Sequence, residues 1–148
     1  MFRGRYQHTI DPKGRLSVPA KFRDVLLAQY NRDLLLVPNE HCLEVHPLEE
    51  WQRIEARMRE QSVFRADVQA LSRLYISRAA EVELDAAGRI LIPPVTREQA
   101  GLAKKEVTLV GGGLARFEVW DRARFEEYER TGQEKLPSLF EGLSSLGV

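Results

Sequence analysis

The sequence lacks the features that would tie this 148-residue chain to a membrane or to a disulfide-stabilised fold. No apolar run exceeds four residues, which excludes a transmembrane helix. The single cysteine, Cys42, has no partner for an internal disulfide, which favours a reducing compartment such as the cytosol. No apolar stretch follows the basic segment at residues 1–6, so we expect no secretory signal. The 22 basic and 22 acidic residues cancel, and this neutrality argues at first against a nucleic-acid partner.

Sequence patterns of catalysis and metal binding are missing as well. Gly111–Gly113 lacks the Lys-Ser/Thr of a Walker A motif and is better explained as a hairpin turn. The side chains with metal-ligand chemistry are His8, His41, Cys42 and His46. Their spacing is a poor match to known zinc sites, so ordinary strand-end residues are the better interpretation. We therefore expect no enzyme, no cofactor and no metal.

One group of carboxylates alternates along a predicted strand, with members Glu81, Glu83 and Asp85. Alternation would place them on one face of the strand, where paired carboxylates can serve acid–base chemistry. No His, Ser or Lys partner lies nearby in the sequence. A solvated strand face is therefore the better explanation.

The chain repeats itself at an offset of 74 residues. Residues 11–19, DPKGRLSVP, align with residues 85–93, DAAGRILIP, and LEVH at 43–46 aligns with FEVW at 117–120. The same offset carries Arg23 onto Arg97 and Leu35 onto Leu109, without a gap over about forty positions. A constant register over separate segments indicates a duplication.

Each copy predicts the same order of elements: a strand, an Asp-x-x-Gly turn, a second strand, a helix and a hairpin. The paired predictions, first copy then second, are strands at 6–10 and 81–84, helices that begin at Pro19 and Pro93, and hairpins at 34–46 and 107–120. About fifty residues of mostly short strands is marginal for an independent core. The two copies should therefore pack together, as an intrachain pseudo-dimer of α+β class with flanking helices.

Helices are predicted around the two hairpins. The first, which starts near Pro47, has one apolar face made of Leu48, Trp51, Ile54 and Met58. The second has a stripe made of Phe64, Val68, Leu71 and Tyr75. Asp121 is the predicted N-cap of a closing helix, with Trp120 and Phe125 at the spacing of a hydrophobic staple. The expected domains are a first repeat at 1–50, a bridging helical pair at 51–76, a second repeat with its closing helix at 77–130, and a frayed, flexible tail at 131–148.

The charges are segregated although their sum is zero. Residues 1–23 carry a local charge of +5, whereas residues 24–71 carry −4 and residues 118–148 carry −3. Of the 22 basic residues 17 are arginine, whose planar guanidinium suits bidentate contact with phosphate or guanine. Neutrality of the whole chain is therefore a weak argument against DNA binding.

The candidate binding residues are basic side chains at the turns and near the N-terminus. Arg15 and Arg89 each follow the glycine of a turn, which projects the same side chain from both copies. Each arginine either pairs with the Asp four residues earlier and fixes the turn, or contacts a ligand, and the two roles can coexist. The other basic residues of the first segment are Arg3, Arg5, Lys21 and Arg23, which are either ordinary surface charges or phosphate contacts.

The residues MFRGRY at 1–6, HTIDPKGRLSVPAKFR at 8–23 and SRAAEVELDAAGRILIP at 77–93 resemble the MraZ family of bacterial regulators of the division and cell-wall gene cluster. The resemblance runs from Met1 to about Tyr128. It implies two SpoVT/AbrB-like domains that form a swapped-hairpin β-barrel, ring-shaped homo-oligomers, and binding to repeated promoter boxes upstream of the protein's own operon. The DNA-facing turns that it implies contain Asp11, Lys13, Gly14 and Arg15 in the first copy, and Asp85, Gly88 and Arg89 in the second. The second copy has Ala87 where the first has Lys13, which suggests an electrostatically weaker second turn.

These observations predict a cytoplasmic, nucleoid-associated transcriptional regulator that binds double-stranded DNA sequence-specifically. Arg15 and Arg89 are expected to contact guanine edges or groove phosphates, while Lys13, Arg3 and Arg5 contact phosphates. The alternative is a ring-forming scaffold whose acidic helices bind a protein, with incidental DNA binding. The −4 and −3 segments motivate that alternative.

Overall fold

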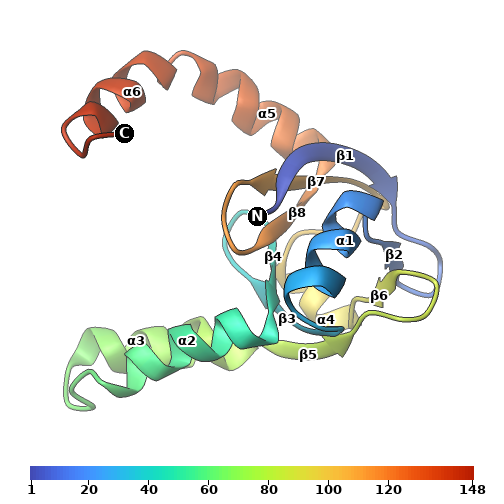
Figure 1. Cartoon of the computed structure of the whole chain (residues 1–148), viewed down its shortest axis with the longest axis horizontal. Helices are drawn as coiled ribbons and strands as arrows, with labels where there is room; N and C mark the ends of the chain where they lie inside the picture. The colour runs from blue at the N-terminus through green and yellow to red at the C-terminus, as the bar shows by residue number, and fades with distance from the viewer.

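The two repeats build one sheet by exchanging strands. The computed structural model describes residues 1–148 and has a mixed α+β fold (Figure 1). Its strands are β1 (Arg3–Thr9), β2 (Arg15–Ser17), β3 (Asp33–Pro38), β4 (Leu43–Pro47), β5 (Ala80–Glu83), β6 (Arg89–Leu91), β7 (Glu106–Gly112) and β8 (Phe117–Asp121). Its helices are α1 (Ala20–Gln29), α2 (Leu48–Arg59), α3 (Ala66–Leu74), the 3₁₀ turn η1 (Ile76–Arg78), α4 (Pro94–Gln99), α5 (Arg122–Gln133) and α6 (Leu136–Ser144). None of these helices has the length and apolar character needed to cross a membrane.

The six-stranded sheet has the order β1-β7-β8-β4-β3-β5, and all of its neighbours are antiparallel. The first strand of each copy pairs with the hairpin of the other copy, because β1 lies against β7 and β5 lies against β3. The two hairpins meet in the middle, where β4 pairs with β8. A separate two-stranded ribbon joins β2 to β6. Neither repeat completes a sheet alone, which agrees with the expectation that the copies pack together.

An approximate two-fold axis relates the copies and passes through both β structures. In the sheet, Glu44 of β4 faces Glu118 of β8, and these residues are the same position of the two repeats. In the ribbon, Leu16 of β2 faces its own equivalent, Ile90 of β6. A position that meets its copy across an antiparallel ladder is the signature of an isologous contact. The chain therefore has the internal symmetry of a homodimer.

The constant offset of 74 residues is wrong over one strand. Leu36 pairs with Val45, and Leu109 pairs with Val119, which is the equivalent of Val45. Leu109 therefore corresponds to Leu36, not to Leu35, and the offset in this strand is 73. The sequence concealed this shift because Leu34–Val37 is apolar throughout and is buried on both faces, so it has no alternation to fix the register.

A single apolar core lies between the two copies. Its 19 buried side chains come almost equally from the first repeat, such as Phe2 and Phe22, and from the second, such as Phe117. The ring of Phe2 lies 5.5 Å from that of Phe22 and 5.2 Å from that of Phe117, in edge-on arrangements that favour aromatic packing. Because side chains of both copies fill the same space, neither half can keep this core without the other.

Two helical arms leave the body on the side away from the β2–β6 ribbon (Figure 1). One arm consists of α2 and α3, and Trp51 anchors it by packing on Leu35 and Val37 at the outer face of the sheet. The predicted stripe of α3 is only partly correct. Tyr75 packs in this cluster, but Phe64 precedes the helix and is 90% exposed.

The other arm consists of α5 and α6. Asp121 caps α5 as predicted, because its carboxylate accepts a hydrogen bond from the Arg124 amide at 3.0 Å. The rings of Trp120 and Phe125 meet at 5.2 Å, which confirms the hydrophobic staple. The tail was expected to be frayed, yet residues Leu136–Ser144 form helix α6 with an exposed apolar face.

Candidate nucleic-acid interface

The first Asp-x-x-Gly-Arg turn is held by its aspartate. The Asp11 carboxylate accepts hydrogen bonds from the amides of Lys13 at 2.9 Å and Arg15 at 2.8 Å, and from Arg15 Nε at 2.6 Å. Gly14 has a φ of +86°, which a residue with a side chain rarely adopts. The hydrogen bond from the Arg15 amide is the main cause that lowers the pKa of Asp11, so its carboxylate stays charged at neutral pH.

The second turn repeats this geometry. Asp85 accepts hydrogen bonds from the amides of Ala87 at 2.9 Å and Arg89 at 2.8 Å, and from Arg89 Nε at 3.2 Å. Gly88 has a φ of +79°, and the Arg89 amide lowers the pKa of Asp85. Both turns are therefore built by the same short-range rules, with Asp11, Gly14, Asp85 and Gly88 as their organising residues.

Each turn is also bonded to the other repeat. The Val18 amide donates to the Gly88 carbonyl at 2.9 Å, and the Ile92 amide donates to the Gly14 carbonyl at 2.9 Å. These two bonds are equivalents of each other under the two-fold axis. They fix the two turns side by side, so a ligand meets a preformed pair rather than two independent loops.

The ribbon presents both arginines on its outer face. Leu16 and Ile90 are buried beneath it, so the alternate residues of β2 and β6 face outward. Arg89 pairs with Ser17, and Ser17 lies two residues after Arg15 in β2. The two arginines are therefore diagonal neighbours across the ribbon, a relation that places two Cα atoms about 7–8 Å apart. Both side chains are 34% exposed and both use Nε for the aspartate, so the terminal Nη groups remain for a ligand.

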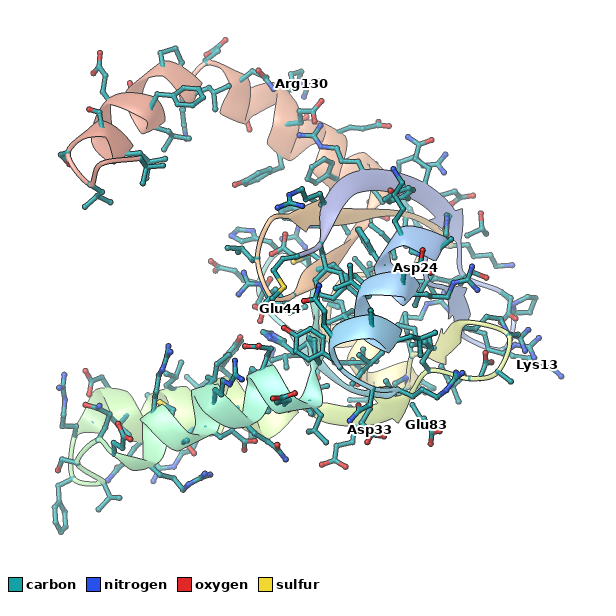
Figure 2. All side chains as sticks on the ribbon, in the orientation of Figure 1. Lys13, Asp24, Asp33, Glu44, Glu83 and Arg130 are labelled. Atoms are coloured by element: carbon teal, nitrogen blue, oxygen red, sulfur yellow. The ribbon has the colours of Figure 1, made fainter.

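The structure brings Lys13 to the same surface. Lys13 lies at the tip of the first turn, exposed and pointing away from the body, on the side remote from the helical arms (Figure 2). Three of the five predicted DNA-contacting residues, Lys13, Arg15 and Arg89, therefore share one end of the molecule.

Arg3 and Arg5 lie elsewhere. They occupy the start of β1, whereas the first turn follows its end at Thr9. Along the strand Arg3 lies roughly 20 Å from that end and Arg5 roughly 13 Å. Arg5 pairs with Glu129 of α5, and its guanidinium carbon lies 5.1 Å from the centre of the Phe125 ring. The positive segment 1–23 includes arginines at the start of β1 as well as basic residues beyond its end. The local charge of this segment therefore does not show that Arg3 and Arg5 lie far from the turns.

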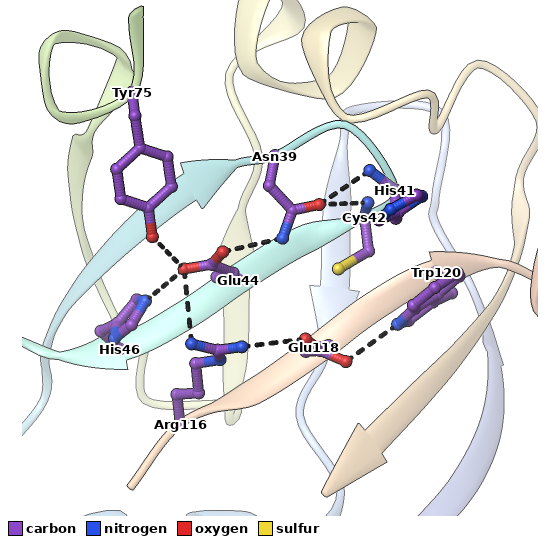
Figure 3. Close-up of polar contacts among 9 residues, drawn as sticks. All are labelled: Asn39, His41, Cys42, Glu44, His46, Tyr75, Arg116, Glu118 and Trp120. Atoms are coloured by element: carbon purple, nitrogen blue, oxygen red, sulfur yellow. Dashed lines mark hydrogen bonds and ion pairs between the residues drawn. The ribbon is translucent and has the colours of Figure 1, made fainter. Parts of the chain in front are cut away.

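A second polar cluster lies at the other end of the two-fold axis, around buried Glu44 (Figure 3). The carboxylate of Glu44 accepts hydrogen bonds from Tyr75 Oη at 2.5 Å, Asn39 Nδ2 at 2.7 Å and His46 Nε2 at 2.8 Å. Burial by itself would raise the pKa of Glu44, but these hydrogen bonds outweigh it and lower the pKa to about 2. Because Tyr75 follows α3, this ionised carboxylate fixes the α2–α3 arm to β4.

The metal-ligand candidates have other roles here. No group of three or more His, Cys, Asp or Glu side chains is placed to hold a metal ion. The amides of His41 and Cys42 donate to the Asn39 side chain, each at 2.8 Å, and so close the hairpin turn. Burial raises the pKa of the Cys42 thiol to about 12. Glu81 and Glu83 are exposed on β5, as the solvated strand face predicts, while Asp85 lies beyond the strand in the turn.

Fold and site together define a class: a duplicated α+β protein that displays two arginine turns about an internal two-fold axis. The family model of the MraZ protein matches residues 1–74 and 75–140, one match for each repeat. The chain belongs to the MraZ family.

Relatives over the whole length agree with this assignment. The chain is 40% identical over 148 residues to a protein of Acetivibrio thermocellus, and 43% identical over 148 residues to a protein of Moorella thermoacetica, with complete coverage of both chains in each comparison. A protein of Heliobacterium modesticaldum is 44% identical over 128 residues, which is 86% of each chain. All three relatives are named transcriptional regulator MraZ.

Proposed function

We propose that this chain is a sequence-specific DNA-binding regulator of transcription. The observation that carries the proposal is the preformed pair of arginine turns on the β2–β6 ribbon, cross-bonded through Gly14 and Gly88. The names of the relatives support the same role. A rigid pair of arginines on an outer β face is well suited to reading a groove, because the major groove admits a two-stranded β-ribbon.

The roles of the site residues follow from their chemistry. The free Nη groups of Arg15 and Arg89 read guanine O6 and N7, while Asp11 and Asp85 orient the guanidinium groups through Nε. Lys13, at the exposed tip, contacts a phosphate. Arg3 and Arg5 serve as further phosphate contacts only for DNA that extends along β1, and Arg5 would then exchange Glu129 for a phosphate.

We extend the proposal to assembly and target. The exchange of strands between hairpins supports the assignment of both repeats, within 1–50 and 77–130, to SpoVT/AbrB-like swapped-hairpin domains. The exposed apolar side chains of the arms, such as Leu74 and Phe140, support self-association into a ring-like homo-oligomer. Several weak sites on one ring would engage repeated promoter boxes with a high effective concentration. The proposed target is the division and cell-wall cluster, and the proposed location is the nucleoid in the cytoplasm.

A titration of labelled promoter DNA tests the function. The labelled duplex carries the region upstream of the operon that encodes this chain. A scrambled duplex of equal length serves as competitor, at a salt concentration of about 150 mM. We expect Arg15→Ala to lose about 1–3 kcal/mol of binding free energy, roughly 5- to 150-fold in affinity. Arg53→Ala is the matched control, because Arg53 is an exposed arginine of α2 that pairs with Glu50.

The outcomes separate the two candidate functions. A preference for the promoter duplex that weakens in Arg15→Ala and persists in Arg53→Ala supports the regulator. Equal binding of the two duplexes by the wild-type chain favours the interaction scaffold. Unchanged affinity and specificity of Arg15→Ala removes this arginine from the site.

A further inference from the structure

The two turns differ in the source of their positive charge. Lys13 gives the first turn a cation of its own, whereas the equivalent position of the second turn is Ala87. The remaining parts of the turns, an aspartate, a glycine and an arginine with the same hydrogen bonds, are alike. On sequence alone the second turn therefore lacks one phosphate contact.

The fold places Arg23, from helix α1 of the first repeat, against the second turn. A Cβ atom built on Gly88 would collide with Nη1 and Cδ of Arg23, so the Arg23 side chain covers the backbone of this turn. Arg23 takes part in no salt bridge, and its buried Nε has no hydrogen-bond partner. A guanidinium that lies on a turn without an acidic partner is available to an anion.

A hollow of about 400 Å³ lies beside Arg23. Its charged and polar lining comes from the first repeat and includes Lys21 and His8, together with Ala87 of the second turn. His8 is oriented by its ring Nδ1, which donates to the Ser17 carbonyl at 2.7 Å. None of the lining side chains is acidic. The hollow is therefore a cationic recess that adjoins the second turn.

The equivalent recess at the first turn is built differently. It measures about 360 Å³ and contains Lys13, Arg97 and the acidic Glu98. Arg97 is the copy of Arg23, but it donates to the carbonyls of Leu102 at 2.7 Å and Ala103 at 3.4 Å. The copies of Lys21 and His8 are the apolar residues Val95 and Val82. Within this recess the one cation that comes from the second repeat, Arg97, is thus engaged by backbone carbonyls.

We propose that the first repeat supplies the phosphate contact of the second turn, with Arg23 as the principal cation and Lys21 as its neighbour. Arg23 takes the place of the lysine that position 87 lacks, and it binds the DNA phosphate next to the base contacted by Arg89. Beside its arginine, the first turn then has Lys13 from its own repeat and the second has Arg23 from the other repeat. Arg32 of the first repeat also reaches the second turn, but its Nη1 donates to the Asp85 carbonyl at 3.1 Å. This inference rests on the proposed DNA-binding function.

A double-mutant cycle over Arg23→Gln and Ala87→Lys tests the inference. Glutamine keeps much of the length of Arg23 without its charge, and lysine at position 87 copies Lys13. The measurement is the affinity for the labelled promoter duplex between 50 and 200 mM salt. One lost phosphate contact reduces the slope of log affinity against log salt by about 0.9, so the advantage of wild type over Arg23→Gln should shrink roughly threefold across this range.

The cycle is expected to be non-additive. Ala87→Lys alone should leave the slope unchanged, because Arg23 already neutralises the phosphate, whereas the double variant should regain the wild-type slope. Arg97→Gln is the matched control and should keep the wild-type slope, because its carbonyl bonds are internal to the protein. A wild-type slope in Arg23→Gln, or a gain of about 0.9 from Ala87→Lys in the presence of Arg23, would overturn the inference.

Two control measurements separate the possible outcomes. Circular dichroism melts establish that Arg23→Gln is folded; if it is not, the unchanged slope of Ala87→Lys alone becomes the test. The wild-type preference for promoter over scrambled DNA separates the two hypotheses. If that preference is absent the proposed function fails, whereas if it is present and Arg23→Gln binds like wild type only the role of Arg23 fails.

Discussion

The first and second turns share their hydrogen bonds and differ in their surroundings. Asp11 and Asp85 each bind two backbone amides and one arginine Nε, with glycine at a positive φ in both turns. Outside this frame, Lys13 has become Ala87, and Arg23 covers the second turn where nothing equivalent covers the first. The backbone geometry of a duplicated turn therefore needs local residues, whereas a charge can come from any segment that the fold brings near.

The far end of the two-fold axis shows the same divergence. Glu44 and Glu118 face each other as equivalents, yet only Glu44 is fully buried and bonded to Tyr75 of the helical arm. Glu118 instead accepts hydrogen bonds from Trp120 Nε1 at 3.1 Å and Arg116 Nη2 at 3.3 Å. Glu44 thus anchors the α2–α3 arm, whereas the hydrogen-bond partners of Glu118 lie in β8 or directly before it.

The largest loss of stability should come from substitutions in the core that both copies share. Phe117→Ala removes a ring that packs on Phe2 and Phe22 of the other repeat, and should cost about 3–5 kcal/mol of unfolding free energy. Leu43→Ala, at the equivalent position, should cost about 2–5 kcal/mol. Each core substitution is made in a Trp51→Phe chain and in a Trp120→Phe chain, so that one tryptophan remains. Urea unfolding followed by the fluorescence of that tryptophan then reports on one copy at a time.

Because the core is common, both tryptophans should report one midpoint, and either core substitution should shift both signals together. Two separate transitions, with only the second repeat affected by Phe117→Ala, would show that the copies fold independently.

Substitution of the paired glutamates should have an intermediate effect on stability. The pKa of Glu44 is about 2 against an ordinary value of 4.5, so its carboxylate contributes on the order of 3 kcal/mol of stability at neutral pH. Since the pKa is lowered in the folded chain, this contribution is present above pH 4.5 and is lost as the pH falls toward 2. Glu44→Gln should therefore destabilise the chain by a few kcal/mol at pH 7 and flatten its acid unfolding between those pH values.

Glu118→Gln is the matched control, because Glu118 is its half-buried equivalent. It should cost about 1 kcal/mol or less at pH 7. Thermal melts of both variants from pH 2.5 to 7 provide the measurement, and identical pH profiles for the two would contradict the anchoring role of Glu44.

The smallest effect on stability should come from the two glycines. Alanine at position 14 or 88 must adopt a left-handed backbone, which costs about 1–2 kcal/mol. The two variants should differ in DNA binding, because a Cβ at position 88 displaces Arg23, whereas at position 14 it meets the Ile92 carbonyl at 3.2 Å. Gly88→Ala should therefore lower the salt slope by about 0.9 relative to Gly14→Ala. Equal slopes in the two variants would mean that Arg23 does not serve the second turn.

The sequence predicted what short-range chemistry determines. The turns, the hairpins and the cap at Asp121 are readable because their determinants lie within a few residues of one another. The duplication itself predicted the shared core and the pairing of equivalent turns, because repeats of about fifty residues are marginal alone.

Contacts between segments that are distant in the sequence cannot be read from local patterns. The contacts of Arg5 with Glu129 and of Arg23 with Gly88 join segments that no local pattern relates. The one-residue shift at Leu36 was hidden by a strand buried on both faces. Helix α6 had a readable signal, since Leu136, Leu139, Phe140 and Leu143 follow helical spacing with Pro137 in the first turn, but the glycines and serines of the tail obscured it.

We propose that the two arginine turns read DNA together about the internal two-fold axis. The most direct test is the binding of the wild-type chain, Arg15→Gln and Arg89→Gln to a set of promoter duplexes that each carry one base-pair substitution. We expect each variant to lose about 1–3 kcal/mol of discrimination at one base pair, and the two base pairs to lie on opposite sides of a common centre. Loss at the same base pair in both variants, or at none, would contradict this proposal.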